Sequence, residues 1–239
     1  MKNSPAREFE GRTVLVTGGS RGIGRSIARA FHEAGARVVI CGRDPASLIA
    51  AARQIGEIVC IPADVRRDAR RLVARLRGRL DILVNNAGGM EHYRNFERTP
   101  LSAWRSTFEE NLFGAVAVTR EALPLLRRSP AGCIVNIASD VGRRPFHMGP
   151  DYCAAKAALI NLTRYLAAEL APIRVNAVCP GPVVTGDWSP REVREAAART
   201  LLGRTGRPEE VAHAVLFAAR ATSLNGAVVG VDGGAVRSP

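Results

Sequence analysis

A tyrosine and a lysine four residues apart could together exchange a proton with a bound molecule. The segment Tyr152-Cys153-Ala154-Ala155-Lys156 opens a predicted helix, and its spacing places the phenol and the ammonium on one face. A free phenol has a pKa of about 10, too high for ready proton exchange at neutral pH, and a nearby ammonium lowers it. The pair therefore predicts acid-base chemistry centred on Tyr152. The same spacing occurs in many unrelated helices, so the surrounding motifs must decide.

A glycine-rich turn near the N-terminus has the spacing of a phosphate-binding loop. It runs Thr17-Gly18-Gly19-Ser20-Arg21-Gly22-Ile23-Gly24 between a predicted strand and a predicted helix. Gly18 would allow the tight turn, Gly22 the close approach of a pyrophosphate, and Gly24 close packing of the helix. The turn could be purely structural, but the strand and helix around it favour a dinucleotide. The expected cofactor contacts are Gly18, Ser20, Arg21, Gly22, Ile23 and Gly24.

The end of the second predicted strand indicates which dinucleotide is bound. Folds of this kind often carry an acidic residue there, which hydrogen-bonds the ribose 2′-hydroxyl. Gly42 stands at that place and Arg43 follows it. A guanidinium can pair with a 2′-phosphate, which a carboxylate would repel, and Arg21 could add a second positive contact. The sequence therefore favours NADP(H) over NAD(H); the opposing interpretation is that Asp44 holds the ribose and Arg43 is a surface residue.

The elements that must position these residues follow from an alternation of short apolar runs and longer helical segments. Predicted strands cover residues 13–17, 38–41, 58–61, 82–84, 134–137, 175–178 and 228–231. The crossovers between them predict an α/β fold, a Rossmann-type doubly wound sheet of about seven parallel strands flanked by helices on both faces. The longest helical segments span residues 102–128 and 151–171. Because ligands of such folds gather at the carboxyl ends of the strands, we expect the site there.

Length and composition limit the alternatives. With 239 residues and 46% hydrophobic content, residues 1–239 are expected to form a single dinucleotide-binding catalytic domain with its core at 11–234. The N-terminal residues lack the apolar region of a signal peptide, and no run of about 18 apolar residues follows, which predicts a soluble, cytoplasmic protein without membrane contact. The spacing of the five cysteines and four histidines indicates no metal site.

The net charge of +12 raises the question of an acidic partner. The run from Arg66 to Arg79 is the densest basic segment, but Ala69, Leu72, Val73 and Leu76 give it one apolar helical stripe. It is therefore interpreted as a solvated helix face. Because no aromatic residues interleave with its arginines, nucleic-acid binding is not expected. A basic surface instead suits phosphorylated cofactors or acidic carriers.

Further motifs, in the right order along the chain, resemble those of the short-chain dehydrogenase/reductase family. The resemblance runs from about Gly11 to Gly234. Besides the glycine turn it rests on Asp64-Val65, Asn85-Asn86-Ala87-Gly88, Asn111, Ser139, Tyr152, Lys156, Pro180-Gly181, Thr185 and Val231-Asp232-Gly233-Gly234. It implies an NADP(H)-dependent oxidoreductase that reduces a ketone, or oxidises the matching secondary alcohol, by hydride transfer.

The resemblance also implies a catalytic tetrad of Asn111, Ser139, Tyr152 and Lys156. Tyr152 would act as the general acid and base at the substrate oxygen, and Ser139 would hydrogen-bond that oxygen. Lys156 would hold the nicotinamide ribose and lower the pKa of Tyr152, while Asn111 would anchor a water that links Lys156 to solvent. The implied cofactor contacts beyond the glycine turn are Asp64, Val65, Asn86, Ala87, Gly88, Tyr152, Lys156, Pro180, Gly181, Val183 and Thr185.

The chain departs from the family pattern at a few places away from the tetrad. The stretch between Asp64 and Asn85 and the turn at 171–174 are shorter than usual, and the approach to the last strand also looks trimmed. Asn225-Gly226 stands where the family commonly has Thr-Gly. These departures would affect surface helices and subunit contacts.

Loops above the nicotinamide would select the substrate. The candidate substrate contacts are His92, His147 and Trp188, and the aromatic and Met residues around them suit a medium-sized, partly apolar substrate or, equally, the packing of a lid. Within the family the nearest resemblance is to 3-oxoacyl-carrier-protein reductases and related ketoreductases, which implies a carrier-bound carbonyl substrate. A free small-molecule ketone of a biosynthetic pathway is the alternative. A carrier-dependent enzyme should lose rate steeply with salt, because opposite-charge steering is screened.

Two expectations concern assembly and class. The resemblance implies a homotetramer, or a homodimer, in which the two long helices pack against those of a neighbour. An alternative of a different class is a non-catalytic NADP(H)-binding sensor, which would leave the complete tetrad unexplained.

Overall fold

A parallel sheet of seven strands carries the fold in the computed structural model, which describes residues 8–90, 93–144 and 149–235. The strands run in the order β3-β2-β1-β4-β5-β6-β7. They are β1 (Thr13–Thr17), β2 (Arg37–Gly42), β3 (Val59–Pro62), β4 (Ile82–Asn85), β5 (Cys133–Ile137), β6 (Arg174–Pro180) and β7 (Val228–Val231). The predicted Rossmann-type doubly wound sheet is confirmed. The chain reverses its direction of winding between β1 and β4, which is where ligands bind in such folds.

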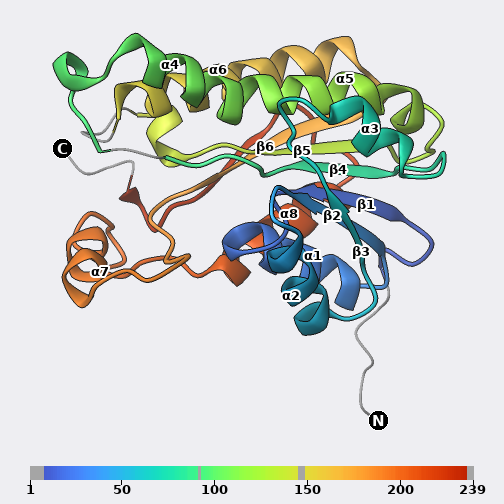
Figure 1. The fold of residues 1–239 in the computed structure, drawn as a ribbon, viewed down its shortest axis with the longest axis horizontal. Coiled ribbons are helices and arrows are strands. Elements are labelled where there is room, and N and C mark those ends of the chain that lie inside the picture. The colour runs from blue at the N-terminus through green and yellow to red at the C-terminus, as the bar shows by residue number, and fades with distance from the viewer. Residues whose placement is uncertain (1–7, 91–92, 145–148, 236–239) are drawn as a thin grey trace.

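Helices cover both faces of this sheet (Figure 1). One layer consists of α1 (Gly22–Glu33), α2 (Pro45–Ile55) and α8 (Pro208–Arg220). The opposite layer consists of α3 (Ala69–Ala74), α4 (Leu101–Phe108), α5 (Gly114–Leu126) and α6 (Pro150–Glu169). The remaining helix, α7 (Pro190–Ala197), lies to the side of both layers, and two 3-10 turns occur at Phe96–Arg98 and Asp140–Gly142.

Alternate residues of the strands supply the apolar cores on the two faces of the sheet. In β1, Val14 and Val16 pack with Ile27 and Phe31 of α1, whereas Leu15 between them belongs to the core on the other face. Side chains alternate across a strand, so a strand buried on both faces reads as a continuous apolar run. This burial fixes the strand register and therefore aligns the carboxyl ends at which the candidate site residues stand.

The predicted helix at 102–128 is wrong in one respect, because a π-helical turn at Glu109–Phe113 separates α4 from α5. The side chain of Asn111 explains the interruption. Its Nδ2 donates to the carbonyl oxygen of Thr107 at 3.0 Å and so takes an acceptor of the helical ladder. A side chain inserted into that ladder is a common cause of such a bulge, and π-bulges concentrate at functional sites.

The basic run 66–79 forms α3 and the turn after it. Its apolar residues Ala69, Leu72, Val73 and Leu76 are buried, while most of its arginines are exposed, as expected for a solvated helix face. In the parts of the chain that the structure describes, no helix has the length and apolar character needed to cross a membrane.

Candidate active site

A cavity of about 1190 Å³ extends along the carboxyl ends of the strands. The predicted cofactor residues all line it, from Gly18 after β1 to Thr185 after β6, and so do Ser139, Tyr152, Lys156 and Trp188. Asn111 is 1% exposed and is not among the described residues that line the cavity. The predicted substrate residues His92 and His147 lie outside the described residues. The structure therefore brings together three members of the tetrad and places the fourth behind them.

The glycine turn has a backbone that side chains would disrupt. Gly18 and Gly22 adopt φ values of 63° and 52°, in the left-handed region that favours glycine. A Cβ on Gly24 would lie 2.2 Å from the carbonyl oxygen of Gly18, so only glycine lets α1 pack this closely against the turn. Arg21 is the N-cap residue of α1, and among the described residues its side chain forms no capping hydrogen bond. The first amides of α1 therefore suit an anion in the cavity.

Asn86 ties the end of β4 to this turn. Its Nδ2 donates to the carbonyl oxygens of Thr17 at 2.9 Å and Gly18 at 3.1 Å, and its backbone N–H donates to Thr17 Oγ1 at 2.9 Å. Asn86 was predicted to contact the cofactor, and it lines the cavity. Its amide group also holds the glycine turn in place, which is a positioning role.

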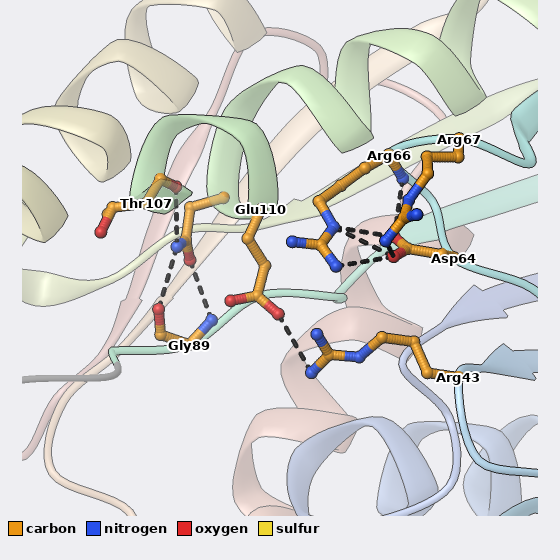
Figure 2. Close-up of polar contacts among 8 residues, drawn as sticks. Arg43, Asp64, Arg66, Arg67, Gly89, Thr107 and Glu110 are labelled. Atoms are coloured by element: carbon orange, nitrogen blue, oxygen red, sulfur yellow. Dashed lines mark hydrogen bonds and ion pairs between the residues drawn. The ribbon is translucent and has the colours of Figure 1, made fainter. Parts of the chain in front are cut away.

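Arg43 reaches across the cavity to a residue that the sequence did not suggest. Its guanidinium lies 3.4 Å from Oε1 of Glu110, in the π-helical turn (Figure 2). The Arg43 side chain is 56% exposed and that of Glu110 only 16%. Glu110 is far from Arg43 in sequence and belongs to no motif, so nothing in the sequence pairs the two. Both side chains line the cavity.

Asp44, the alternative ribose partner, caps α2. Its carboxylate accepts hydrogen bonds from the N–H groups of Ala46 at 3.2 Å and Ser47 at 3.0 Å, and from the Ser47 hydroxyl. These bonds, that of the Ser47 hydroxyl first, hold the pKa of Asp44 below its usual value. Because the carboxylate already serves as an N-cap, its geometry favours the interpretation that Arg43 faces the ribose.

Asp64 is surrounded by arginine. Nη2 of Arg66 lies 2.7 Å from Oδ2 of Asp64, and Nη2 of Arg67 lies 3.7 Å from the same oxygen (Figure 2). The hydrogen bond from Arg66 is the main reason that the pKa of Asp64 falls to about 2. The carboxylate is therefore ionised and paired, so it adds little repulsion toward a phosphorylated ligand.

Tyr152 and Lys156 lie in the first two turns of α6, on one face as predicted. Lys156 Nζ lies 5.6 Å from the centre of the Tyr152 ring and donates to the carbonyl oxygen of Ile137 at 3.0 Å. Burial lowers the pKa of Lys156 to about 8. Burial also raises the pKa of Tyr152, against an opposing hydrogen bond from Ser139. In the protein alone, desolvation of the phenolate thus outweighs the lowering expected from Lys156.

Ser139 follows β5 and touches a carboxylate that the sequence did not single out. Its Oγ donates to Oδ1 of Asp140 at 3.0 Å, and the same oxygen accepts from the N–H of Val141 at 2.8 Å. Burial raises the pKa of Asp140 above its usual value. An acidic residue after the serine has no obvious signature in sequence, because its importance depends on burial in the folded chain.

Asn111 is buried behind the cavity wall and hydrogen-bonds to the backbone of that wall. Its Nδ2 donates to the carbonyl oxygen of Gly89 at 2.9 Å, and its Oδ1 accepts from the Gly89 N–H at 3.0 Å. Gly88 has a φ of 143°, and a Cβ there would lie 2.6 Å from Asn111 Oδ1. The side chain therefore clamps the turn after β4, and the predicted water relay stays a prediction.

The cavity lining that is not assigned to the cofactor is more charged than expected. Met90, Tyr93 and Trp188 contribute to its wall, as the predicted partly apolar lining requires. Charged side chains from the 3-10 turn after β5 and from α7 and its flanks join them, namely Asp140, Arg144, Asp187, Glu192, Glu195 and Arg199. Such a wall can hydrogen-bond a polar substrate at several points.

Comparison with known proteins agrees with this geometry. Residues 18–236 match the family model described as Enoyl-(Acyl carrier protein) reductase. The chain is 40% identical to L-fucose dehydrogenase of Bos taurus, over 95% of this chain and 90% of that one. It is 38% identical to the rhamnolipids biosynthesis 3-oxoacyl-[acyl-carrier-protein] reductase of Pseudomonas aeruginosa, over 96% of this chain and 98% of that one.

A solved structure extends the likeness to three dimensions. The NADP active-site complex of Pseudomonas aeruginosa RhlG superposes with a TM-score of 0.90 at 37% identity, covering 97% of this chain and 99% of that one. Sequence motifs, sheet order, cavity and relatives all agree. The chain belongs to the short-chain dehydrogenase/reductase family of oxidoreductases.

Proposed function

We propose that this protein is an NADP(H)-dependent oxidoreductase that interconverts a ketone and the matching secondary alcohol. The observation that carries the proposal is one cavity that joins the glycine turn to Ser139, Tyr152 and Lys156. The residues fit the cofactor. A side chain at Gly24 would clash with the glycine turn, and the first residues of α1 line the cavity. When bound, NADP(H) supplies or accepts a hydride at its nicotinamide.

The chain's own residues would handle the proton. In reduction, the carbonyl carbon gains the hydride and Tyr152 gives its phenolic proton to the carbonyl oxygen; in oxidation the phenolate takes the hydroxyl proton. Lys156, with a pKa of about 8, is mostly charged at neutral pH and favours the phenolate by its charge. Ser139 hydrogen-bonds the substrate oxygen and steadies the charge that develops there.

Two features support NADP(H) over NAD(H). Arg43 stands after β2 with its guanidinium half-exposed at the cavity, whereas the neighbouring carboxylate of Asp44 caps α2. The solved relative RhlG is an NADP complex, and its chain matches this one almost end to end. We infer that Arg43 binds the 2′-phosphate and that Arg21, at the mouth of the turn, adds a second positive charge.

The substrate class is proposed from the relatives and the cavity wall together. The 3-oxoacyl-carrier-protein reductase relative and the net charge of +12 support a carrier-bound 3-oxoacyl thioester, because a basic surface steers an acidic carrier. The charged wall around Arg144, Asp187 and Glu192 supports a second candidate, a free polar carbonyl or its alcohol. The L-fucose dehydrogenase relative is consistent with that candidate.

A turnover panel separates the two classes. We would follow reduced nicotinamide absorbance with acetoacetyl thioesters on a carrier protein and on coenzyme A in the reductive direction, and with L-fucose in the oxidative direction. Carrier-bound turnover that falls steeply from about 0.01 M to about 1 M ionic strength, where screening shortens from roughly 30 Å to 3 Å, would support the carrier. Turnover of L-fucose alone would support the free polar substrate. No turnover of any ketone or alcohol in a wider panel would contradict the proposed function.

A further inference from the structure

The hydroxyl of Ser139 has a single proton, for which Asp140 and a substrate oxygen would compete. It donates to Oδ1 of Asp140 at 3.0 Å, and Ser139 and Tyr152 both line the cavity in which that oxygen would bind. A serine hydroxyl has one O–H to donate and lone pairs that accept. Whichever group receives the proton, the other must donate to Ser139 or lose the bond.

We propose that Asp140 is a positioning residue that sets the direction of the Ser139 hydrogen bond, and thereby the pH range over which Ser139 can donate to a ketone oxygen during reduction. This inference rests on the proposed function, because it assigns Ser139 and Tyr152 to the substrate oxygen. It adds a residue outside the expected tetrad.

Ionised Asp140 arranges the site for an alcohol. A carboxylate can only accept, so it takes the proton of Ser139, which then presents lone pairs to the hydroxyl groups of Tyr152 and of an alcohol substrate. Neutral Asp140 arranges the site for a ketone. Its carboxyl group can donate to Ser139 Oγ, and the Ser139 proton is then free to stabilise a carbonyl oxygen as negative charge develops on it.

Burial and the neighbouring charged groups together hold the pKa of Asp140 above that of an exposed aspartate. Asp232 at the end of β7 adds negative charge, while Arg199 after α7 opposes it; Tyr152 and Cys179 in turn sense the Asp140 charge. Arg143 moderates the effect, since its Nη1 lies 3.0 Å from Oδ2 of Asp232. Burial is the largest influence and raises the pKa of Asp140. We therefore expect titration above the ordinary aspartate value of about 3.9.

The first test measures this contact without any substrate. Carbon-13 NMR of the Asp140 carboxyl, assigned with Asp140→Asn, gives its pKa in the wild-type protein and in Ser139→Ala. Because the Ser139 hydroxyl stabilises the carboxylate, we expect the pKa of Asp140 to rise in Ser139→Ala. Asp232→Asn serves as a control that removes a charge but touches neither hydroxyl, and it should lower the pKa of Asp140. An unchanged pKa in Ser139→Ala overturns the inference.

The second test follows pH profiles of kcat/KM for acetoacetyl-coenzyme A reduction and L-fucose oxidation. As pH rises through the pKa of Asp140, wild-type reduction should fall by about tenfold or more, toward the 10²–10³-fold loss typical of a removed oxyanion donor. Asp140→Asn cannot ionise, so this inflection should vanish, whereas Asp232→Asn should move it to lower pH.

The control Tyr152→Phe distinguishes a failure of the proposed function from a failure of the role of Asp140. Wild-type activity in Tyr152→Phe would refute the proposed function. An inactive Tyr152→Phe with an Asp140→Asn profile identical to wild type would overturn only the role of Asp140. NADPH binding and thermal unfolding of each variant verify that it is folded.

Discussion

Among single residues, Lys156 combines a proposed catalytic role with a cost to stability. Its pKa falls from 10.5 in the free side chain to about 8 in the folded protein, because burial disfavours the ammonium. When folding lowers the pKa of a lysine, the protonated lysine destabilises the folded protein. This cost is complete at any pH below the pKa of the folded state, and it disappears as the pH rises through the pKa of the unfolded state. The difference corresponds to roughly 3 kcal/mol near pH 7.

We expect Lys156→Met to unfold with a free energy about 1–2 kcal/mol higher than wild type at pH 7, because the gain exceeds the lost hydrogen bond to Ile137. The advantage should shrink between about pH 8 and pH 10.5, as the wild-type ammonium loses its proton. Urea denaturation at both ends of this range measures it. A Lys156→Met protein less stable than wild type at pH 7 would contradict the account.

Arg43 should decide the choice of cofactor. Arg43→Ala is expected to weaken NADPH binding by about tenfold to a hundredfold, the usual value of a charged hydrogen bond, and to leave NADH binding nearly unchanged. Glu110→Gln is the matched variant, since it removes the competing partner of Arg43 and should strengthen NADPH binding by about twofold to fivefold. Fluorescence titration with both nucleotides measures the effect. Equal weakening of NADPH and NADH by Arg43→Ala would disprove this role.

The residues that could be predicted from sequence are those with local spacing. Tyr152 and Lys156 lie one helical turn apart, and the glycine turn is a continuous segment between strand and helix. Glu110 could not be predicted, because its role depends on Arg43, which follows a strand distant in sequence. Asp140 could not be predicted, because its role depends on its burial beside Ser139. Nothing in the sequence indicated that burial would raise the pKa of Tyr152.

Among the elements, the glycine turn and α1 form one unit whose packing can be tested. Gly24→Ala should lower the free energy of unfolding by about 1–3 kcal/mol, because its Cβ would lie 2.2 Å from a backbone oxygen. Gly186→Ala is the control, since a Cβ there meets no described atom within 4 Å and should change stability by less than about 0.5 kcal/mol. Thermal and urea unfolding compare the two. Similar stability of both variants would show that the turn can shift.

Prediction of the elements succeeded where burial leaves a regular pattern. The seven strands were found to within two residues at each end, and inner strands such as β1, β4 and β5 are apolar runs buried on both faces, which are distinctive in sequence. The break at Glu109–Phe113 was missed because the hydrophobic period continues through it. Its cause is the bonding of Asn111 to Thr107 and Gly89, and Gly89 lies in another part of the chain.

For the whole molecule, the layer of α4, α5 and α6 is the surface on which we expect subunits to meet. It exposes Tyr165 of α6 by 62% and Phe113 next to α5 by 48%. We propose a homotetramer or homodimer in which these helices pack against those of a neighbour. Sedimentation velocity should give two or four chain masses, and Tyr165→Glu should shift the protein toward the monomer. A monomeric wild-type protein would contradict this assembly.

The measurement that bears most directly on the central claim is a comparison of wild type with Tyr152→Phe, which removes one hydroxyl and keeps the ring. NADPH binding is followed by fluorescence, and turnover by reduced nicotinamide absorbance with acetoacetyl-coenzyme A and L-fucose. The account predicts that Tyr152→Phe binds NADPH nearly as well as wild type and loses about 10²–10⁴-fold in kcat. A variant that retains wild-type turnover would show that Tyr152 is not the acid and base of this site.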